Sequence, residues 1–79
     1  MIVTTSRYAS DFTRDYAKKI EGRYTARGKK TVDELVETAW KQGHEKILIV
    51  EEKESKPGFL SEVLIDHWGN WKWGEKSAI

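Results

Sequence analysis

Two short basic segments carry the residues whose types and spacing could bind an anion. The first, Thr4-Thr5-Ser6-Arg7, directly follows an apolar pair at the start of a predicted strand. Hydroxyl and backbone N–H groups donate hydrogen bonds, and the planar guanidinium of an arginine matches pairs of phosphate oxygens. Since α/β sheets bind ligands where a strand ends and a helix begins, this segment is a candidate phosphate site. In the alternative interpretation, Thr5 and Ser6 only satisfy backbone groups of the loop and Arg7 is solvated.

The second basic segment, Arg27-Gly28-Lys29-Lys30, also precedes a predicted helix. Gly28 permits a positive φ or a close backbone approach to a ligand. If the first two strands are neighbours, both segments lie at one edge of the sheet, and Arg14 and Lys18, one turn apart on the first helix, extend that edge. The alternative is a solvated basic turn. The candidate anion-binding residues are Thr5, Ser6, Arg7, Arg14, Lys18, Arg27, Gly28, Lys29 and Lys30.

The charge is distributed unevenly along the chain. Residues 1–30 contain eight basic and three acidic residues, a net charge of +5, whereas residues 31–79 contain six lysines and ten acidic residues, a net charge of −4. The total of +1 conceals this asymmetry. A basic segment that also holds the candidate anion site favours an anionic partner on that side, although small domains often have lopsided charge.

A third group of residues consists of Trp68, Trp71 and Trp73 near the C-terminus. If Gly69-Asn70 is a two-residue hairpin turn, Trp68 faces Trp71 across it, and Trp73 shares a face with Trp71. These side chains could form part of the core, a surface for a partner or a second copy, or a platform for nucleic-acid bases. We expect them to form an interface.

No set of residues converges on catalysis or metal binding. The only histidines, His44 and His67, are far apart in the sequence, and there is no cysteine. Serines lack a histidine placed to activate them, and we interpret Glu51-Glu52-Lys53-Glu54 as a solvated strand end. There is no glycine-rich phosphate loop of the P-loop or Rossmann type. We therefore expect a non-enzymatic protein with no catalytic residues, no metal and no cofactor.

The elements that must position these groups follow from local patterns. Ser10 can cap a helix over 11–20, in which Phe12, Tyr16 and Ile20 form one apolar face. Gly22 ends this helix. Thr31 and Glu34 form a capping box, and the helix after it has an apolar face comprising Val32, Leu35, Val36, Ala39 and Trp40. Strands are predicted at 2–5, 23–26, 47–50, 62–68 and 71–73, with a turn at Pro57-Gly58 and a frayed tail from Gly74.

This order of elements predicts the α/β class: a small layered β-α-β-α-β-β domain over residues 1–79. We expect a mixed, partly parallel sheet with two helices and a C-terminal hairpin. The longest apolar run, Ile47 to Val50, is four residues, so no membrane span or signal peptide is predicted. We expect a soluble protein of the cytoplasm.

The chain also resembles a known family in several segments that occur in the same order. These are "TTSR" after the first strand, the basic helix "RDYAKK", "RGKKTVDELVETA" and "ILIVEEKESKPGFL". Over about residues 2–65 they resemble the N-terminal half of the Brix domain, and the archaeal Brix proteins are the most similar. That domain has two similar α/β halves, each resembling the anticodon-binding domain of class IIa aminoacyl-tRNA synthetases.

The resemblance implies ribosomal RNA binding and a role in rRNA processing or ribosome biogenesis. The matched positions are Thr5, Ser6, Arg7, Arg27, Gly28 and Lys29. A full Brix domain has a second half of comparable length, so residues 1–79 are either a natural half-domain or a fragment. One half could pair with a second copy of itself through the tryptophans. The alternative function is a protein-interaction module, binding a second copy or a ribosome-assembly protein without contacting RNA.

Overall fold

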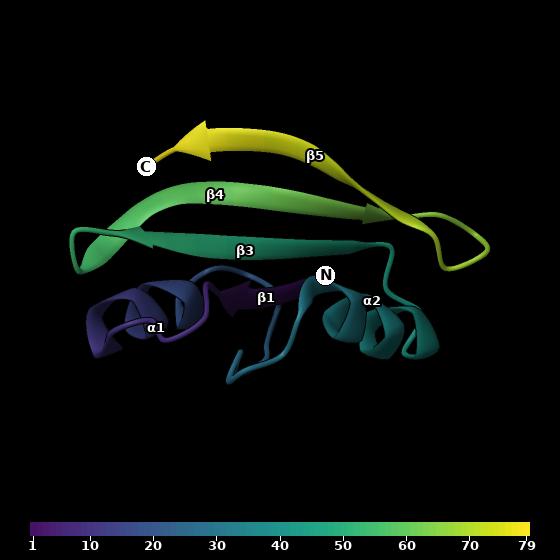
Figure 1. Cartoon of the computed structure of the whole chain (residues 1–79), viewed down its shortest axis with the longest axis horizontal. Coiled ribbons are helices and arrows are strands. Elements are labelled where there is room, and N and C mark those ends of the chain that lie inside the picture. The colour runs from purple at the N-terminus through teal and green to yellow at the C-terminus, as the bar shows by residue number, and fades with distance from the viewer.

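The computed structural model describes all residues, 1–79, as a five-stranded sheet with two helices. Along the chain the elements are β1 (Ile2–Thr5), α1 (Asp11–Lys18), β2 (Arg23–Tyr24), α2 (Val32–Lys41), β3 (Lys46–Lys53), β4 (Lys56–Ile65) and β5 (Trp71–Ala78) (Figure 1). The strand order is β2-β1-β3-β4-β5, with β1 parallel to both of its neighbours and the β3-β4 and β4-β5 pairs antiparallel. The predicted mixed α/β sheet is confirmed.

The two helices cover opposite faces of the sheet. Neighbouring residues of a strand point to opposite faces, and Ile47 and Ile49 pack in the cluster that contains α2, whereas Val50 packs in the cluster that contains Ala17 of α1. The helices also lie toward opposite ends of β3 (Figure 1). Each face of the sheet is therefore covered by a helix over only part of its length. Neither helix is long and apolar enough to cross a membrane.

Local sequence accounts for α2 better than for α1. Thr31 and Glu34 form the predicted capping box, and Leu35, Val36 and Ala39 are buried as predicted. Trp40 is 45% exposed, so it lies at the margin of that face.

The apolar face predicted for α1 is wrong at its first position. Thr13 and Ala17 are the buried residues of the helix, whereas Phe12 is 64% exposed. The helix also ends at Lys18 rather than Ile20. The buried Thr13 hydroxyl donates to the Glu52 carboxylate, so its burial leaves no polar group unsatisfied.

The second half of the chain departs most from the predicted turns. The β3-β4 turn lies at Glu54 and Ser55, both with positive φ of 53° and 65°, as a type I′ turn requires. Pro57-Gly58 is not a turn: both residues lie in β4, beside a shift in register at Glu51/Glu52. Asparagine and glycine are the residues that usually form such turns, and neither occurs at position 54 or 55. The prediction of a turn at Pro57-Gly58 is therefore wrong.

The C-terminal hairpin is longer than predicted, and its loop is wider. Ile65 pairs with Trp71, so the loop spans residues 66–70, and Trp68 does not face Trp71. The Asp66 carboxylate accepts hydrogen bonds from the backbone N–H groups of Trp68 and Asn70, both at 2.9 Å. The segment from Gly74 is not frayed, because β5 continues to Ala78 with a second register shift opposite Ser61/Val63.

Candidate functional site

The two basic segments meet at one edge of the sheet, as predicted from adjacent first strands. β1 and β2 are parallel neighbours, so their carboxyl ends lie together. An open pocket of about 410 Å³ lies there, and Tyr8, Ala9 and Ala26 help to line it. We call it the basic pocket. Its lining includes six of the nine candidate residues: Thr5, Ser6, Arg14, Arg27, Gly28 and Lys29.

Arg27 joins the two segments and is itself buried, with 9% of its surface exposed. Its Nη1 donates to the carbonyl of Thr5 at 2.9 Å, and its Nε donates to the carbonyl of Lys30 at 2.7 Å. Burial, with a smaller contribution from the nearby Arg7 charge, lowers the pKa of Arg27 below its usual value. Two of its five donors are therefore used to hold the loop after β2 against the end of β1.

The other charged candidates differ in how freely they could reach a ligand. Arg7 and Lys29 are exposed and make no hydrogen bond or ion pair within the chain. Lys30 donates to the carbonyl of Ala26 at 3.2 Å, and the Lys18 ammonium lies 5.4 Å from the centre of the Tyr24 ring. Arg14 donates to the carbonyl of Ala9 at 2.8 Å and pairs with the exposed Asp11. Arg7 and Lys29 are thus the freest cations of the edge.

The hydroxyl groups of Thr5 and Ser6 contact backbone groups of the chain. Thr5 is 2% exposed, and its Oγ1 donates to the carbonyl of Ser6 at 3.0 Å. The Ser6 Oγ accepts a hydrogen bond from the backbone N–H of Glu52 at 3.1 Å. Thr4 is fully buried, and its Oγ1 has no hydrogen-bond partner. These contacts fix the path of the loop between β1 and α1.

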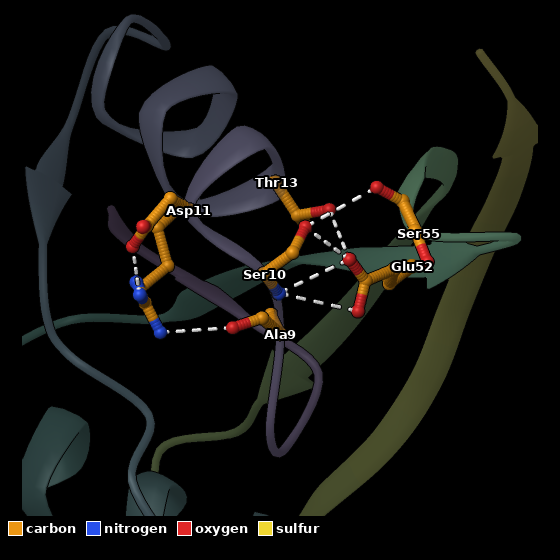
Figure 2. A network of polar contacts seen from close by, with 7 residues as sticks. Ala9, Ser10, Asp11, Thr13, Glu52 and Ser55 are labelled. Atoms are coloured by element: carbon orange, nitrogen blue, oxygen red, sulfur yellow. Dashed lines mark hydrogen bonds and ion pairs between the residues drawn. The ribbon is translucent and has the colours of Figure 1, made fainter.

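The carboxylate of Glu52 occupies the N-terminus of α1. The sequence had suggested that this position could bind an anionic ligand. Glu52 accepts hydrogen bonds from the backbone N–H of Ser10 at 3.0 Å and from the Thr13 hydroxyl at 3.0 Å (Figure 2). The Ser10 hydroxyl also donates to Glu52 and makes no capping bond within its own helix. The prediction that Glu52 belongs to a solvated strand end is therefore wrong.

This contact was missed because its partners are 42 and 39 residues apart in the sequence. The available signal was the pair of hydroxyls, Ser10 and Thr13, one turn apart at the start of a helix. A negative charge near that helix end is favoured by the helix dipole. Consequently, a phosphate at this edge is more easily held by the cations of the basic pocket than by the N-terminus of α1.

The Glu52 contact makes a pH-dependent prediction for stability. Its hydrogen bonds with Ser10 and Thr13 lower the pKa of the Glu52 carboxyl below its usual value. A lowered carboxyl pKa contributes stability that is complete above the unfolded-state pKa of about 4.3 and is lost as the pH falls through the folded-state pKa. We expect Glu52→Gln to unfold at a lower urea concentration than wild type at pH 7, and this difference should shrink below pH 4.

The matched control for this experiment is Glu21→Gln, because Glu21 is exposed and has no ion pair. It should change the urea midpoint little at either pH. A difference between Glu52→Gln and wild type that stayed constant from pH 7 to pH 3 would show that the carboxylate charge is not what stabilises the helix.

The three tryptophans predicted to form an interface have different surroundings. Trp71 packs against the α2 core cluster, and its indole N–H donates to Asp33 at 2.7 Å. Trp73 is 55% exposed and meets Trp71 edge-to-face at 5.4 Å between ring centres. Trp68 is 76% exposed and meets His67 edge-to-face. Trp71 therefore contributes to the core, while Trp68 and Trp73 remain available to a partner.

The tryptophans and the basic pocket lie at opposite ends of the sheet. Leu64, next to the end of β4, pairs with Lys46 at the start of β3, whereas Thr5 pairs with Val50 near the other end of β3. Figure 1 shows the same arrangement, with the β4-β5 loop far from the end of β1. One ligand of small size cannot use both surfaces. No group of three or more metal-ligating side chains forms in the structure.

Comparison with known sequences gives relatives from archaea. No family model matches the chain. It is 32% identical to a probable Brix domain-containing ribosomal biogenesis protein of Pyrococcus abyssi, with 87% of this chain and 34% of that protein covered. A protein of the same name from Thermococcus kodakarensis is 30% identical, with 87% and 36% covered. The chain thus spans about a third of the length of these curated relatives.

Solved structures show the same fold. A crystal structure of a probable ribosomal biogenesis protein from Aeropyrum pernix K1 superimposes with a TM-score of 0.87 at 25% identity, covering 99% of this chain and 46% of that one. Mil, an archaeal Imp4-like protein, superimposes with a TM-score of 0.72 at 25% identity, covering 90% and 46%. In both cases the chain matches just under half of the solved protein.

Proposed function

Because this chain is a homologue of the archaeal Brix domain-containing ribosomal biogenesis proteins, we propose that it acts in ribosome biogenesis by binding ribosomal RNA. In this proposal residues 1–79 act as one half of a Brix-type domain, in the cytoplasm and without catalysis. The observation that carries the proposal is the meeting of two basic loops around one open pocket at the carboxyl ends of β1 and β2. Open α/β sheets bind ligands outside the carboxyl ends of their parallel strands.

The roles proposed for the site residues follow from their surroundings. Arg7 and Lys29, both exposed and unpaired, would contact backbone phosphates, with Arg14, Lys18 and Lys30 adding positive charge around them. Arg27, with Thr5, Ser6 and Gly28, would shape the pocket. Phosphate contacts of this type give affinity and orientation without reading sequence.

The salt dependence of binding tests this proposal. We expect a fragment of structured ribosomal RNA to bind the wild-type protein less tightly as salt rises, with a slope of about −0.7 in log affinity against log salt for each single-stranded phosphate contacted. Arg7→Ala/Lys29→Ala should bind more weakly at low salt, and its slope should be shallower by about 1.4. Filter binding over a series of salt concentrations measures both quantities.

A matched control removes the same charge at the other end of the molecule. Lys41→Ala/Lys72→Ala neutralises one lysine at the end of α2 and one in β5, opposite Leu64. It should retain nearly the wild-type slope, because these lysines are far from the basic pocket. If the two double variants bind RNA with equal affinity, the basic edge is not the RNA-binding surface.

The alternative function remains a protein-interaction module that binds a second copy or an assembly protein. The observation that favours it is the exposure of Trp68 and Trp73, because tryptophan often dominates the energetics of protein interfaces. β5 is also an edge strand, paired with β4 alone. In the same salt series, this alternative expects no measurable RNA binding by the wild-type protein.

A further inference from the structure

Tyr8 has a backbone conformation that its side chain does not favour. It lies in the loop between β1 and α1 with a φ of 59°, and the other non-glycine residues with positive φ are the two residues of the β3-β4 turn. A large aromatic residue in the left-handed region is a genuine outlier, since glycine or asparagine adopts it at lower cost. Folding alone would be served better by another residue at this position.

The Tyr8 side chain does not contribute to the core either. It is 77% exposed and belongs to neither buried cluster. Phe12, in the first turn of α1, is 64% exposed and is also outside both clusters. Two large aromatic rings within five residues therefore remain in solvent, although the domain has few apolar residues with which to form its core.

Both aromatic residues belong to the end of the sheet that carries the basic pocket. Tyr8 lines the pocket together with Arg14 and Lys29. Phe12 lies between Ser10 and Thr13, which bind Glu52 close to the end of β3. Trp68 and the exposed Trp40, which donates to the carbonyl of His67, are at the opposite end of the sheet. This end therefore combines exposed aromatic rings with Arg7 and Lys29, the two cations of the basic segments that make no hydrogen bond or ion pair within the chain.

We infer that Tyr8 is a base-stacking residue of the basic pocket and that the RNA bound there is unpaired. The inference rests on the proposed function and adds the class of RNA. Cations at the edge hold the phosphates, and an exposed ring beside them offers a flat apolar surface to a neighbouring base. Bases in a duplex stack on one another and are not available to the ring, whereas unpaired bases can turn outward and stack on it. Every base has such a face, so the contact tolerates different sequences.

The test compares single-stranded and double-stranded RNA. The probe is a fluorescein-labelled 12-nucleotide RNA of mixed sequence, alone or annealed to its complement, followed by anisotropy at low salt. Wild type should bind the single strand more tightly than the duplex. Tyr8→Asn removes the ring but keeps a residue that accepts positive φ, so the loop should keep its shape. This variant should bind the single strand about 5- to 100-fold more weakly, with an unchanged salt slope.

A conservative variant separates the role of the ring from that of its hydroxyl group. Tyr8→Phe keeps the aromatic ring and should bind the single strand within about twofold of wild type. If Tyr8→Asn binds like wild type while Arg7→Ala/Lys29→Ala binds more weakly, the stacking inference is wrong and the proposed function stands. Equal binding of single strand and duplex by wild type also overturns the inference. If wild type binds neither RNA, the proposed function fails together with it.

Discussion

Truncation of Ile47 to alanine is expected to lower the free energy of unfolding by about 2–5 kcal/mol. Ile47 is fully buried on the central strand of the sheet, where β3 pairs with both β1 and β4 and packs against α2. A domain of this length has a total stability of about 4–12 kcal/mol, so the substitution removes a large part of it. Urea unfolding followed by circular dichroism measures the change.

The next residue along β3 provides the matched control. Leu48 points to the opposite face, where it is only partly buried at the edge of the α1 cluster. Leu48→Ala removes as many carbon atoms as Ile47→Ala does. Because Leu48 is only partly buried, this variant should nevertheless destabilise the domain less than Ile47→Ala. If Leu48→Ala were the more damaging variant, the assignment of α2 to the better-packed face of the sheet would be wrong.

The sequence predicted those features that are set by neighbouring residues. The capping box of Thr31 and Glu34 was predictable because its hydrogen bonds close within four residues of the chain. The basic edge was predictable in part, since it requires only that the first two strands pair in parallel, as they do. Adjacent strands in a small α/β sheet leave few other arrangements.

Contacts between distant segments could not be predicted in the same way. Nothing near Glu52 in the sequence indicates that it binds the start of α1, and its acidic neighbours made it resemble a solvated stretch. The β3-β4 turn was misplaced because Glu54 and Ser55 have positive φ without being glycine or asparagine. In both cases contacts between distant segments override the local conformational preferences of the residues. Only those local preferences can be read from neighbouring residues in the sequence.

Arg27 shows how the structure changes the role expected for a candidate residue. As one of two arginines in basic loops, it is equivalent to Arg7 in the sequence, and both were expected to contact phosphate. In the structure Arg27 is buried between two backbone carbonyls, whereas Arg7 is exposed and unpaired. Loss of RNA binding in an Arg27 variant would therefore report on the loop as well as on the charge.

We expect Arg27→Ala to lower the free energy of unfolding by about 2–4 kcal/mol, because a buried and a part-buried hydrogen bond from a charged group to backbone carbonyls are lost together. The loop that carries Gly28 and Lys29 should then detach from the end of β1. Arg27→Lys should restore little of the stability, since a single ammonium cannot reproduce the planar pair of donors that reaches Thr5 and Lys30. Urea unfolding of both variants measures these changes.

Arg7→Ala is the matched control, since it removes the same charge from the same edge without removing a contact within the chain. Its stability should stay within about 0.5 kcal/mol of wild type. Its RNA binding should weaken mainly at low salt, as expected for a phosphate contact. Arg27→Ala should weaken binding at low salt more than Arg7→Ala does and make the salt slope shallower still, because the detached loop no longer presents Lys29. If the two variants are equally stable, the buried arginine does not hold the basic pocket together, and the edge is assembled by the sheet alone.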